Sequence, residues 1–478
     1  MLKELNLSNV GPSPSLHLEF GSRLNLLTGD NGLGKSFLLD IAWWVLTRRW
    51  PSEINRKITG GLPARPVAGS GFGVINATGT MTGVGLAARP VAGSGFGAIN
   101  ATGTITGGGL PARPVAGRKA EIQFTFTGVT KPVSYVSHYD RKLQSWTGTA
   151  GRPANPGLVL YAQVDGSFSV WDPARNYWRK KGNVDVQDRP PAYVFSPREV
   201  WDGLHDADGK LQCNGLISDW AGWQKEKGQA FQSLCAVLAA LSASELDQMS
   251  PGELTRIGLD DPRDIPTLQM PYGQAVPVLE ASAGMKRIIA LAYLLVWSWE
   301  EHKKASEILG QETATQVIFL IDEVEAHLHP RWQRQIIRAL MSVMQVLTKV
   351  TNVQIIAATH SPLVLASVEP VFDSNQDAWF DLDFVQDDKN PRVELVRREF
   401  VRRGDVSNWL TSPAFDLPSA RSIEAETVLR AASAAMDNPN FNGQDAKFLD
   451  GKLRAVLGEL DPFWMRWRFV AEKKGWLQ

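Results

Sequence analysis

Residues 29–36 read Gly29-Asp30-Asn31-Gly32-Leu33-Gly34-Lys35-Ser36 and match the pattern G-x-x-x-x-G-K-[ST]. The run Arg23 to Thr28 before them is mostly apolar and predicts a strand, and Ser36 to Arg48 after them has the apolar spacing of a helix. A glycine-rich loop between a strand and a helix is the context in which this pattern binds phosphate. The glycines let backbone N–H groups surround phosphate oxygens, and the helix N-terminus adds positive potential.

The loop also carries two side chains with expected roles. Lys35 is expected to reach the β- and γ-phosphates of a nucleotide, and Ser36 is expected to coordinate Mg²⁺. The alternative is a glycine-rich structural turn, which the strand and helix on either side make less favourable. The stretch therefore predicts an α/β fold that binds a nucleotide with Mg²⁺.

A second apolar run ends in two carboxylates. Val317 to Ile321 read VIFLI and predict a buried central strand, followed directly by Asp322 and Glu323. At the carboxyl end of such a strand, Asp322 would hold Mg²⁺ through water, and Glu323 would polarise the attacking water as a general base. The alternative is an ordinary strand followed by acidic loop residues.

Three further stretches carry a resemblance to a known family. Residues 322–333 read DEVEAHLHPRWQ and resemble the DE-x-E-x-HLHP-x-WQ run of the ABC-type ATPases found in bacterial AAA family ATPases, relatives of the RecF, SMC and OLD groups. Residues 357–362, AATHSP, resemble the T-H-S-P switch of that family. Residues 281–287, ASAGMKR, resemble its S-x-G signature, although Ala281 and Ala283 replace the Leu and Gly of transporter-like versions.

The resemblance covers residues 1–60 and about 270–370, and it implies both fold and cofactor. The implied fold is a P-loop NTPase of ABC-ATPase type, with a mixed central sheet, an antiparallel β subdomain and a helical C-terminal part. The implied cofactors are ATP and Mg²⁺. The family also uses a Mg²⁺-binding glutamine, for which Gln123, Gln163 and Gln187 all remain candidates.

The resemblance also implies a dimer in which two copies associate head to tail around ATP. Ser282 and Gly284 of one copy would contact the γ-phosphate held by Lys35 of the other, and His360 would contact that phosphate from the P-loop side. A serine hydroxyl and backbone N–H groups at a helix start suit this contact because they donate hydrogen bonds to an anion without a charge of their own.

A repeated segment interrupts the chain. Residues 61–84 and 85–108 are near-identical copies of 24 residues, and 109–117 begin a third. The copies have few large apolar residues, so we interpret 61–117 as a Gly/Pro-rich insertion, with a binding loop as the alternative. The expected organisation places the ATPase core in 1–60 and 281–400, an antiparallel β lobe in 118–215, a helical lobe in 216–280 and a helical region in 401–478.

Composition narrows the class of protein. The 478 residues carry no net charge, are 44% hydrophobic and include two cysteines, which argues for a globular cytoplasmic protein without a disulfide framework. No apolar run is long enough to span a membrane, so no membrane partner is expected. His327 and His329 with Glu325 suggest a metal site, but a loop at the dimer interface is favoured. The basic residues near 392–403 and 466–474 are expected to be solvated, with phosphate binding as the alternative.

The chain has no long heptad stretch and no acidic cluster in its tail, so neither SMC-type arms nor a Toprim nuclease is expected. The function we expect is an ATP-hydrolysing dimerisation switch in bacterial DNA repair or anti-phage defence, acting on DNA or on a separately encoded effector nuclease. The alternatives are the nucleotide-binding subunit of a transporter and a non-hydrolytic ATP-dependent scaffold.

Overall fold

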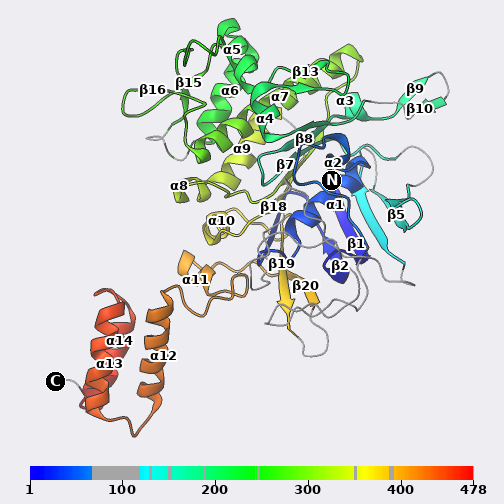
Figure 1. Cartoon of the computed structure of the whole chain (residues 1–478). Helices are drawn as coiled ribbons and strands as arrows, with labels where there is room; N and C mark the ends of the chain where they lie inside the picture. The colour runs from blue at the N-terminus through cyan, green and yellow to red at the C-terminus, as the bar shows by residue number, and fades with distance from the viewer. Residues whose placement is uncertain are drawn as a thin grey trace. The chain divides into compact units, whose positions relative to one another are not determined.

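The computed structural model forms two compact units, Met1–Arg402 and Arg403–Gln478 (Figure 1). Most of the predicted insertion and the candidate Gln187 lie outside the residues that the structure describes. The described residues are 1–66, 119–128, 132–148, 153–181, 184–186, 190–242, 244, 248–348, 352–386 and 392–476.

The first unit is built on a mixed central sheet whose strands follow the order β11-β8-β7-β17-β18-β3-β19-β20. The five neighbours from β7 to β19 run parallel, and β11, β8 and β20 are antiparallel to their neighbours. The bounds are β3 (Leu24–Gly29), β7 (Leu158–Ala162), β8 (Phe168–Trp171), β11 (Tyr193–Phe195), β17 (Gln316–Ile321), β18 (Asn352–Ala358), β19 (Ala378–Val385) and β20 (Arg392–Arg398).

A second, antiparallel sheet has the order β2-β1-β4-β5-β6. Its strands alternate buried and exposed residues, as in the pattern of β4, because one face packs on the core and the other meets solvent. The bounds are β1 (Leu2–Val10), β2 (Ser13–Glu19), β4 (Glu121–Thr127), β5 (Pro132–Asp140) and β6 (Ser145–Trp146).

The predicted antiparallel lobe over 118–215 is divided between these two sheets. Strands β4 to β6 belong to the second sheet, and β7, β8 and β11 belong to the central one. The hairpin predicted around Asp165-Gly166 is confirmed, because β7 pairs antiparallel with β8. The other edge of β7, however, pairs in parallel with β17. A strand has two hydrogen-bonding edges, and sequence alternation reports on neither.

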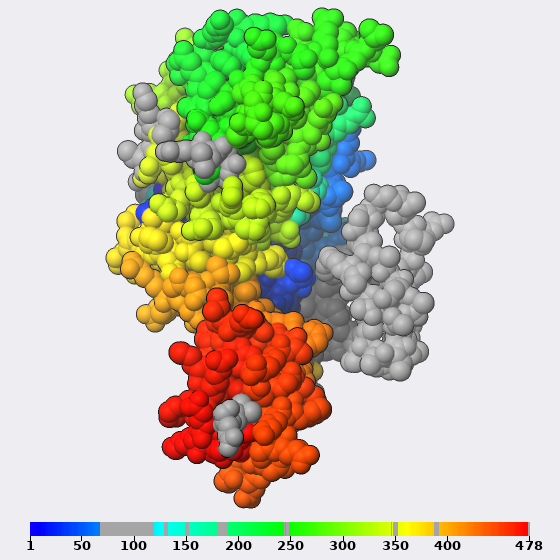
Figure 2. Space-filling model, turned by 90° about the vertical axis from the view of Figure 1, so that its left-hand side faces the viewer, coloured from blue at the N-terminus to red at the C-terminus, as the bar shows by residue number. Residues whose placement is uncertain are grey.

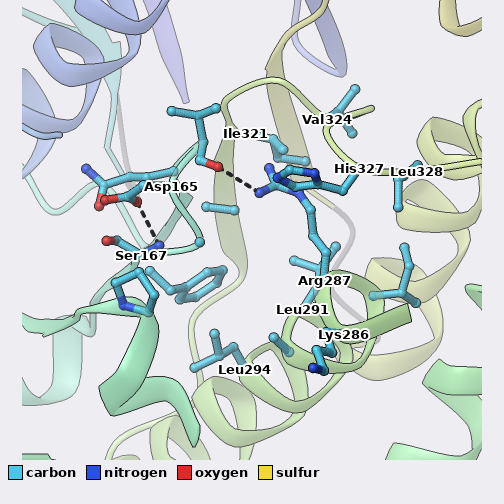
Figure 3. A pocket seen from close by; sticks show the side chains of 18 of the residues that line it. Asp165, Ser167, Lys286, Arg287, Leu291, Leu294, Ile321, Val324, His327 and Leu328 are labelled. Carbon is cyan, nitrogen blue, oxygen red and sulfur yellow. Dashed lines mark hydrogen bonds between the residues drawn. The ribbon is translucent and has the colours of Figure 1, made fainter. Parts of the chain in front are cut away.

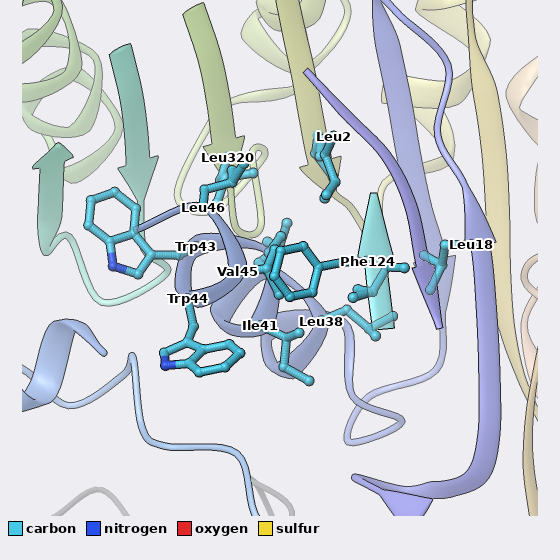
Figure 4. Packing of buried hydrophobic residues seen from close by; sticks show 14 of the residues in the cluster. Leu2, Leu18, Leu38, Ile41, Trp43, Trp44, Val45, Leu46, Phe124 and Leu320 are labelled. Carbon is cyan, nitrogen blue, oxygen red and sulfur yellow. The ribbon is translucent and has the colours of Figure 1, made fainter. Parts of the chain in front are cut away.

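Helix α1 (Lys35–Thr47) lies between the two sheets and joins them through one hydrophobic core (Figure 4). Leu38 and Val45 lie toward Phe124 of the antiparallel sheet, whereas Leu320 comes from the central sheet. Trp43 is fully buried in this core. The helix that begins in the glycine-rich loop is therefore held on two sides by apolar contacts.

The part of the chain that follows the β lobe is mainly helical. Its surface is green to yellow-green in Figure 2. The predicted helix over 331–350 is observed as two helices, and the predicted helical lobe also contains a small sheet, β14-β15-β16. The main helices are α4 (Pro197–Asp202), α5 (Leu216–Glu226), α6 (Gln229–Ala240), α7 (Ala283–Ile308), α8 (Pro330–Gln333), α9 (Ile336–Thr348) and α10 (Pro362–Val368).

The shorter elements complete the first unit. They are α2 (Pro51–Ile54), α3 (Pro173–Asn176), β9 (Arg179–Lys181), β10 (Val184–Val186), β12 (Leu204–His205), β13 (Leu211–Cys213), β14 (Ser250–Pro251), β15 (Thr267–Gln269) and β16 (Ala275–Pro277).

The second unit is helical, as predicted, with its own core around the buried side chains of Ala432, Leu453 and Trp467. Its helices break at the two predicted proline sites, near Pro439 and Pro462. They are α11 (Val406–Leu410), α12 (Ile423–Asp437), α13 (Gly443–Val456) and α14 (Phe463–Lys473). Within the described parts of the chain, no helix has the length and apolar character needed to cross a membrane.

The burial of α1 predicts a stability effect. Trp43→Ala should lower the free energy of unfolding by about 3–5 kcal/mol, because a large cavity would open between the sheets. Urea unfolding followed by far-UV circular dichroism measures this change. The control is Leu259→Ala, since Leu259 is fully exposed and its loss should cost less than about 0.5 kcal/mol. Equal losses in both variants would contradict the core role of α1.

Candidate nucleotide-binding site

The site lies where four neighbouring parallel strands, β7, β17, β18 and β3, end together. Backbone hydrogen bonds continue past the strand ends: the Asp322 N–H donates to the Ala162 carbonyl at 2.9 Å, and the Thr359 N–H donates to the Leu27 carbonyl at 3.0 Å. The loops that follow these strands carry the glycine-rich motif, the two predicted carboxylates and the predicted switch histidine. Parallel pairing therefore brings the sequence-distant motifs to one edge, where α/β sheets bind ligands.

The glycine-rich loop has the backbone that its sequence predicts. Gly29, Gly32 and Gly34 all have positive φ, and a Cβ at Gly29 would lie 2.3 Å from the Leu382 carbonyl oxygen of β19. Glycine is required at Gly29 by both its backbone angle and this close approach. Gly34 directly precedes α1, so the first helical N–H groups point into the loop.

Lys35 folds back over this loop. Its Nζ donates to the carbonyl oxygens of Gly29 at 2.8 Å and of Asp30 at 2.9 Å. Burial lowers the pKa of Lys35 to about 8, against the opposing effect of nearby carboxylates such as Asp322. A buried ammonium held only by carbonyl oxygens would gain from a full negative charge, which a phosphate would supply.

Asp322 lies beside Ser36, the other residue expected to hold Mg²⁺. Asp322 is 2% exposed, and its Oδ1 has no hydrogen-bond partner among the residues that the structure describes. Burial raises the pKa of Asp322 to about 6, although a hydrogen bond from Ser36 opposes the rise. An unpartnered buried carboxylate oxygen is costly unless a ligand satisfies it. Together with the exposed Ser36 hydroxyl, it offers the hard oxygen donors that Mg²⁺ prefers.

Of the two candidate glutamines that the structure describes, Gln163 lies at this edge and Gln123 does not. Gln163 directly follows β7, as Asp322 directly follows the neighbouring strand β17, and it is 2% exposed, yet neither its amide nitrogen nor its amide oxygen has a partner among the described residues. Gln123 instead pairs with Asn6 inside the antiparallel sheet. The five residues before Gln163, LVLYA, are all apolar rather than alternating, which is the signal for a central parallel strand that could have singled it out.

The loop after β17 is strained at two positions. Glu323 has φ 44° and His327 has φ 63°, in the left-handed region that non-glycine residues rarely adopt. Such strain commonly marks functional loops. Glu323, the predicted general base, lies outside any helix or strand, so the backbone of this loop sets its direction.

Glu325 anchors the same loop to the switch residues. Its carboxylate accepts hydrogen bonds from the Thr359 hydroxyl at 2.7 Å and from the backbone N–H of His360. Burial raises the pKa of Glu325. His329 instead caps α8, and within the described chain no group of three or more His, Cys, Asp or Glu side chains is placed to hold a metal ion. The two hydrogen bonds of Glu325 therefore connect the loop after β17 to the segment after β18.

His360 follows β18 and is half-buried. Burial, helped by the positive charge of Lys35, lowers its pKa to about 4. The imidazole is therefore neutral at pH 7 and has one N–H available to donate. A neutral donor suits contact with phosphate in a site where Lys35 already supplies the positive charge.

The predicted signature residues lie at the start of α7. Ser282 is exposed and caps the helix, its hydroxyl accepting from the Met285 N–H at 3.3 Å. Gly284 is buried, and a Cβ there would lie 2.6 Å from the His327 carbonyl oxygen. Only glycine lets α7 approach the loop after Glu323 this closely.

Arg287, one turn further along α7, is a residue whose role the sequence analysis missed. Its side chain extends toward the loop that carries Val324 and His327 (Figure 3). The guanidinium donates to the carbonyl oxygens of Asp322 at 3.0 Å, Glu323 at 3.2 Å and Val164 at 3.1 Å. Burial lowers its pKa, while the surrounding carboxylates oppose that change. Arg287 thus connects the signature helix to the ends of β7 and β17.

The central part of the chain matches a known protein family. Residues 119–366 match the family described as "AAA domain, putative AbiEii toxin, Type IV TA system". The chain is 26% identical over 207 residues to "Retron Ec83 probable ATPase" of Escherichia coli, covering 42% of this chain and 33% of that protein. It is 35% identical over 86 residues to "Septu protein PtuA" of Bacillus mycoides, covering 18% and 10%.

The chain therefore spans a third or less of the length of these relatives. Among solved structures, it is similar to the "SMC head domain from Thermotoga maritima", with 14% identity, a TM-score of 0.36, and coverage of 83% of this chain and 99% of that one.

The contacts of Arg287 predict a structural effect of its removal. Arg287→Lys keeps the charge but cannot reach three carbonyls at once, so we expect a lower free energy of unfolding by about 1.5–3 kcal/mol. Thermal unfolding with a denaturant series measures it. Lys286→Gln, at the neighbouring position, is the control and should change stability by less than about 0.5 kcal/mol. An Arg287→Lys protein as stable as this control would show that the three contacts do not hold the loop.

Proposed function

Residues 119–366 of the chain match an AAA-domain family, so the chain belongs to that family, and on that premise we propose that it binds ATP with Mg²⁺, hydrolyses it and uses the cycle as a dimerisation switch. One observation carries the proposal. Among the described residues, one oxygen of the Asp322 carboxylate has no hydrogen-bond partner, the Ser36 hydroxyl lies beside that carboxylate, and Gln163, whose amide also has no partner there, follows the neighbouring strand β7. Buried polar groups without partners at a phosphate-binding loop are those a Mg-nucleotide would satisfy.

The residues divide the work of phosphoryl transfer between them. Lys35 would exchange the Gly29 and Asp30 carbonyls for the β- and γ-phosphates. Ser36, Asp322 and Gln163 would hold the metal, which neutralises phosphate charge when bound.

Hydrolysis then needs a water molecule and a base. Glu323 would accept a proton from water as the water oxygen forms its bond to the γ-phosphorus. The bond from that phosphorus to the β,γ-bridging oxygen breaks, and ADP and phosphate leave. His360, neutral at pH 7, would donate a hydrogen bond to the γ-phosphate.

Dimer closure would supply the remaining contacts. Ser282 is exposed at the N-terminus of the 26-residue helix α7, where the helix dipole favours an anion. The γ-phosphate of a second copy would be that anion, with Gly284 at the same helix start. Arg287 connects this helix to the Asp322 and Glu323 carbonyls. A contact of Ser282 with the γ-phosphate of the other copy would therefore act on Asp322 and Glu323 of the copy that supplies Ser282.

The names of two relatives bear on the cellular role of the proposed ATPase. One is named as a retron ATPase and another as a Septu protein, which supports action in anti-phage defence. We propose a cytoplasmic homodimer that signals to a separately encoded effector nuclease, to DNA, or to both.

The proposed switch predicts a change of mass. Glu323→Gln should keep ATP bound, because the base is lost while the phosphate contacts remain, and Mg-ATP should convert it from monomer to dimer. Multi-angle light scattering, with and without duplex DNA, measures the change. Lys35→Ala is the control, and it should neither bind nucleotide nor change mass.

Two results would contradict parts of this scheme. Hydrolysis by Glu323→Gln at the parent rate would show that Glu323 is not the base. A mass that ignores Mg-ATP, despite measured nucleotide binding, would show that ATP does not drive association. Ser282→Arg, which should bind ATP yet fail to dimerise, separates closure from binding.

The raised pKa of Asp322 predicts a pH dependence. The carboxylate must be ionised to hold a cation, so metal affinity should fall about tenfold per pH unit below pH 6. An ordinary aspartate would keep its affinity to about pH 4. Electron paramagnetic resonance of Mn²⁺, used in place of Mg²⁺ with ATP between pH 5 and 8, follows this. Asp322→Asn, measured in parallel, gives the titration of the nucleotide alone, and an identical profile in both proteins would exclude Asp322 as the titrating ligand.

A further inference from the structure

Residues 59–66, which we call the strap, follow α2, include the first six residues of the first repeat, and pass beside Gln163 and Asp165 at the end of β7. At its start, Thr59 donates to the Asp165 carboxylate from both its hydroxyl, at 2.5 Å, and its backbone N–H, at 3.2 Å. The Gly61 carbonyl accepts from the backbone N–H of Ser52 at 3.2 Å and from its hydroxyl at 2.9 Å. The first half of the strap is therefore held on both sides.

The other half of the strap reaches the glycine-rich loop. The Trp146 indole N–H donates to the Ala64 carbonyl at 2.9 Å, and Pro66 forms a bridge with Val10 at the end of β1. The β1–β2 turn that follows Val10 packs on the loop, since a Cβ at Gly34 would lie 2.9 Å from Pro12. Although these residues fall within the predicted insertion 61–117, the structure makes 61–66 part of the core.

The strap packs directly against the amide of Gln163. A Cβ at Gly60 would lie 3.3 Å from Gln163 Nε2, and a Cβ at Gly61 would lie 3.0 Å from the same atom. Within the described residues neither amide atom of Gln163 has a hydrogen-bond partner, so none of these residues orients the side chain by a polar contact. The two glycines are the wall that limits its position on this side.

Gln163 also has room to move. It lines a cavity of about 190 Å³ between the β7–β8 turn and α7, whose apolar walls include Leu291 and Leu294 (Figure 3). A side chain that pushes the amide from the strap side would displace it into this space rather than meet a rigid barrier. A free amide oxygen that is confined but not hydrogen-bonded is ready to bind a cation, and small displacements of it would change that binding.

We propose that the strap positions the Gln163 amide for Mg²⁺, with Thr59, Gly60 and Asp165 acting as positioning residues. This inference rests on the proposed function, because it assigns the control of the metal site within it. It also means that the first residues of the repeated segment, 61–66, belong to the strap, which packs against Gln163. Movement of the strap would therefore change the strength of metal binding.

The test increases the size of the side chain at position 60 in two steps. Gly60→Ala should raise the Mg²⁺ concentration for half-maximal ATP hydrolysis about three- to tenfold, and Gly60→Leu more than tenfold. Both should leave ATP binding in EDTA, and the melting temperature, within error of the parent. Thr59→Val, which removes the hydroxyl donor to Asp165, should change the Mg²⁺ requirement in the same direction. Gly258→Ala and Gly258→Leu are the matched controls, since a Cβ there meets nothing within 4 Å.

A double-mutant cycle separates positioning from general damage. In a Gln163→Ala background, Gly60→Leu should have no further effect on the Mg²⁺ requirement, because the group that it displaces is gone. Additive effects would overturn the inference, as would Gly60 variants that match the Gly258 controls or that weaken ATP binding in EDTA equally. Failure of the parent protein to show Mg²⁺-dependent hydrolysis would instead refute the proposed function, and the inference with it.

Discussion

The parallel pairing of β7, β17, β18 and β3 is the constraint on which the rest of the structure depends. Two of its pairings, β7 with β17 and β18 with β3, join segments that are more than a hundred residues apart. All four strands end at one edge, so Gln163, Asp322, Thr359 and the glycine-rich loop become neighbours. Parallel strands of this kind must be covered on both faces, and the two coverings have different functions. One is the antiparallel sheet with α1, and the other is the layer of helices that includes α7.

Each covering layer fixes a different part of the site. Helix α1 is packed between two sheets, and this packing holds the start of the helix at the glycine-rich loop. Helix α7 approaches on the other side, where Gly284 permits close contact and Arg287 binds the carbonyls at the strand ends. The loop after β17 is held by hydrogen bonds from the Thr359 hydroxyl and the His360 N–H to the Glu325 carboxylate. Asp322 Oδ1 and the Gln163 amide are among the buried polar groups that have no partner within the described residues, and they lie at the ends of β17 and β7.

The strap connects the end of the site at Gln163 with the end at the glycine-rich loop. It is bound to Asp165 beside Gln163 and then to the β1–β2 turn that packs on the glycine-rich loop. Since the first repeat begins at Gly61, inside the strap, the Gly/Pro-rich segment and the nucleotide site share a boundary. The physical link between them is a steric one, namely the absence of side chains at Gly60 and Gly61.

Contiguous motifs were enough to determine the phosphate-binding loop, the acidic strand end and the switch segment, because backbone conformation and local residue chemistry specify each of them within a few residues. The same local reasoning located the strand–loop–helix order and the helical tail. Tertiary structure alone decided that β7 is a parallel neighbour of β17, and hence that Gln163 rather than Gln123 reaches the site. It also decided the contacts of Arg287 and Gly60. These depend on pairings between distant segments, and no short-range pattern in the chain specifies which strand edges or helix starts will meet.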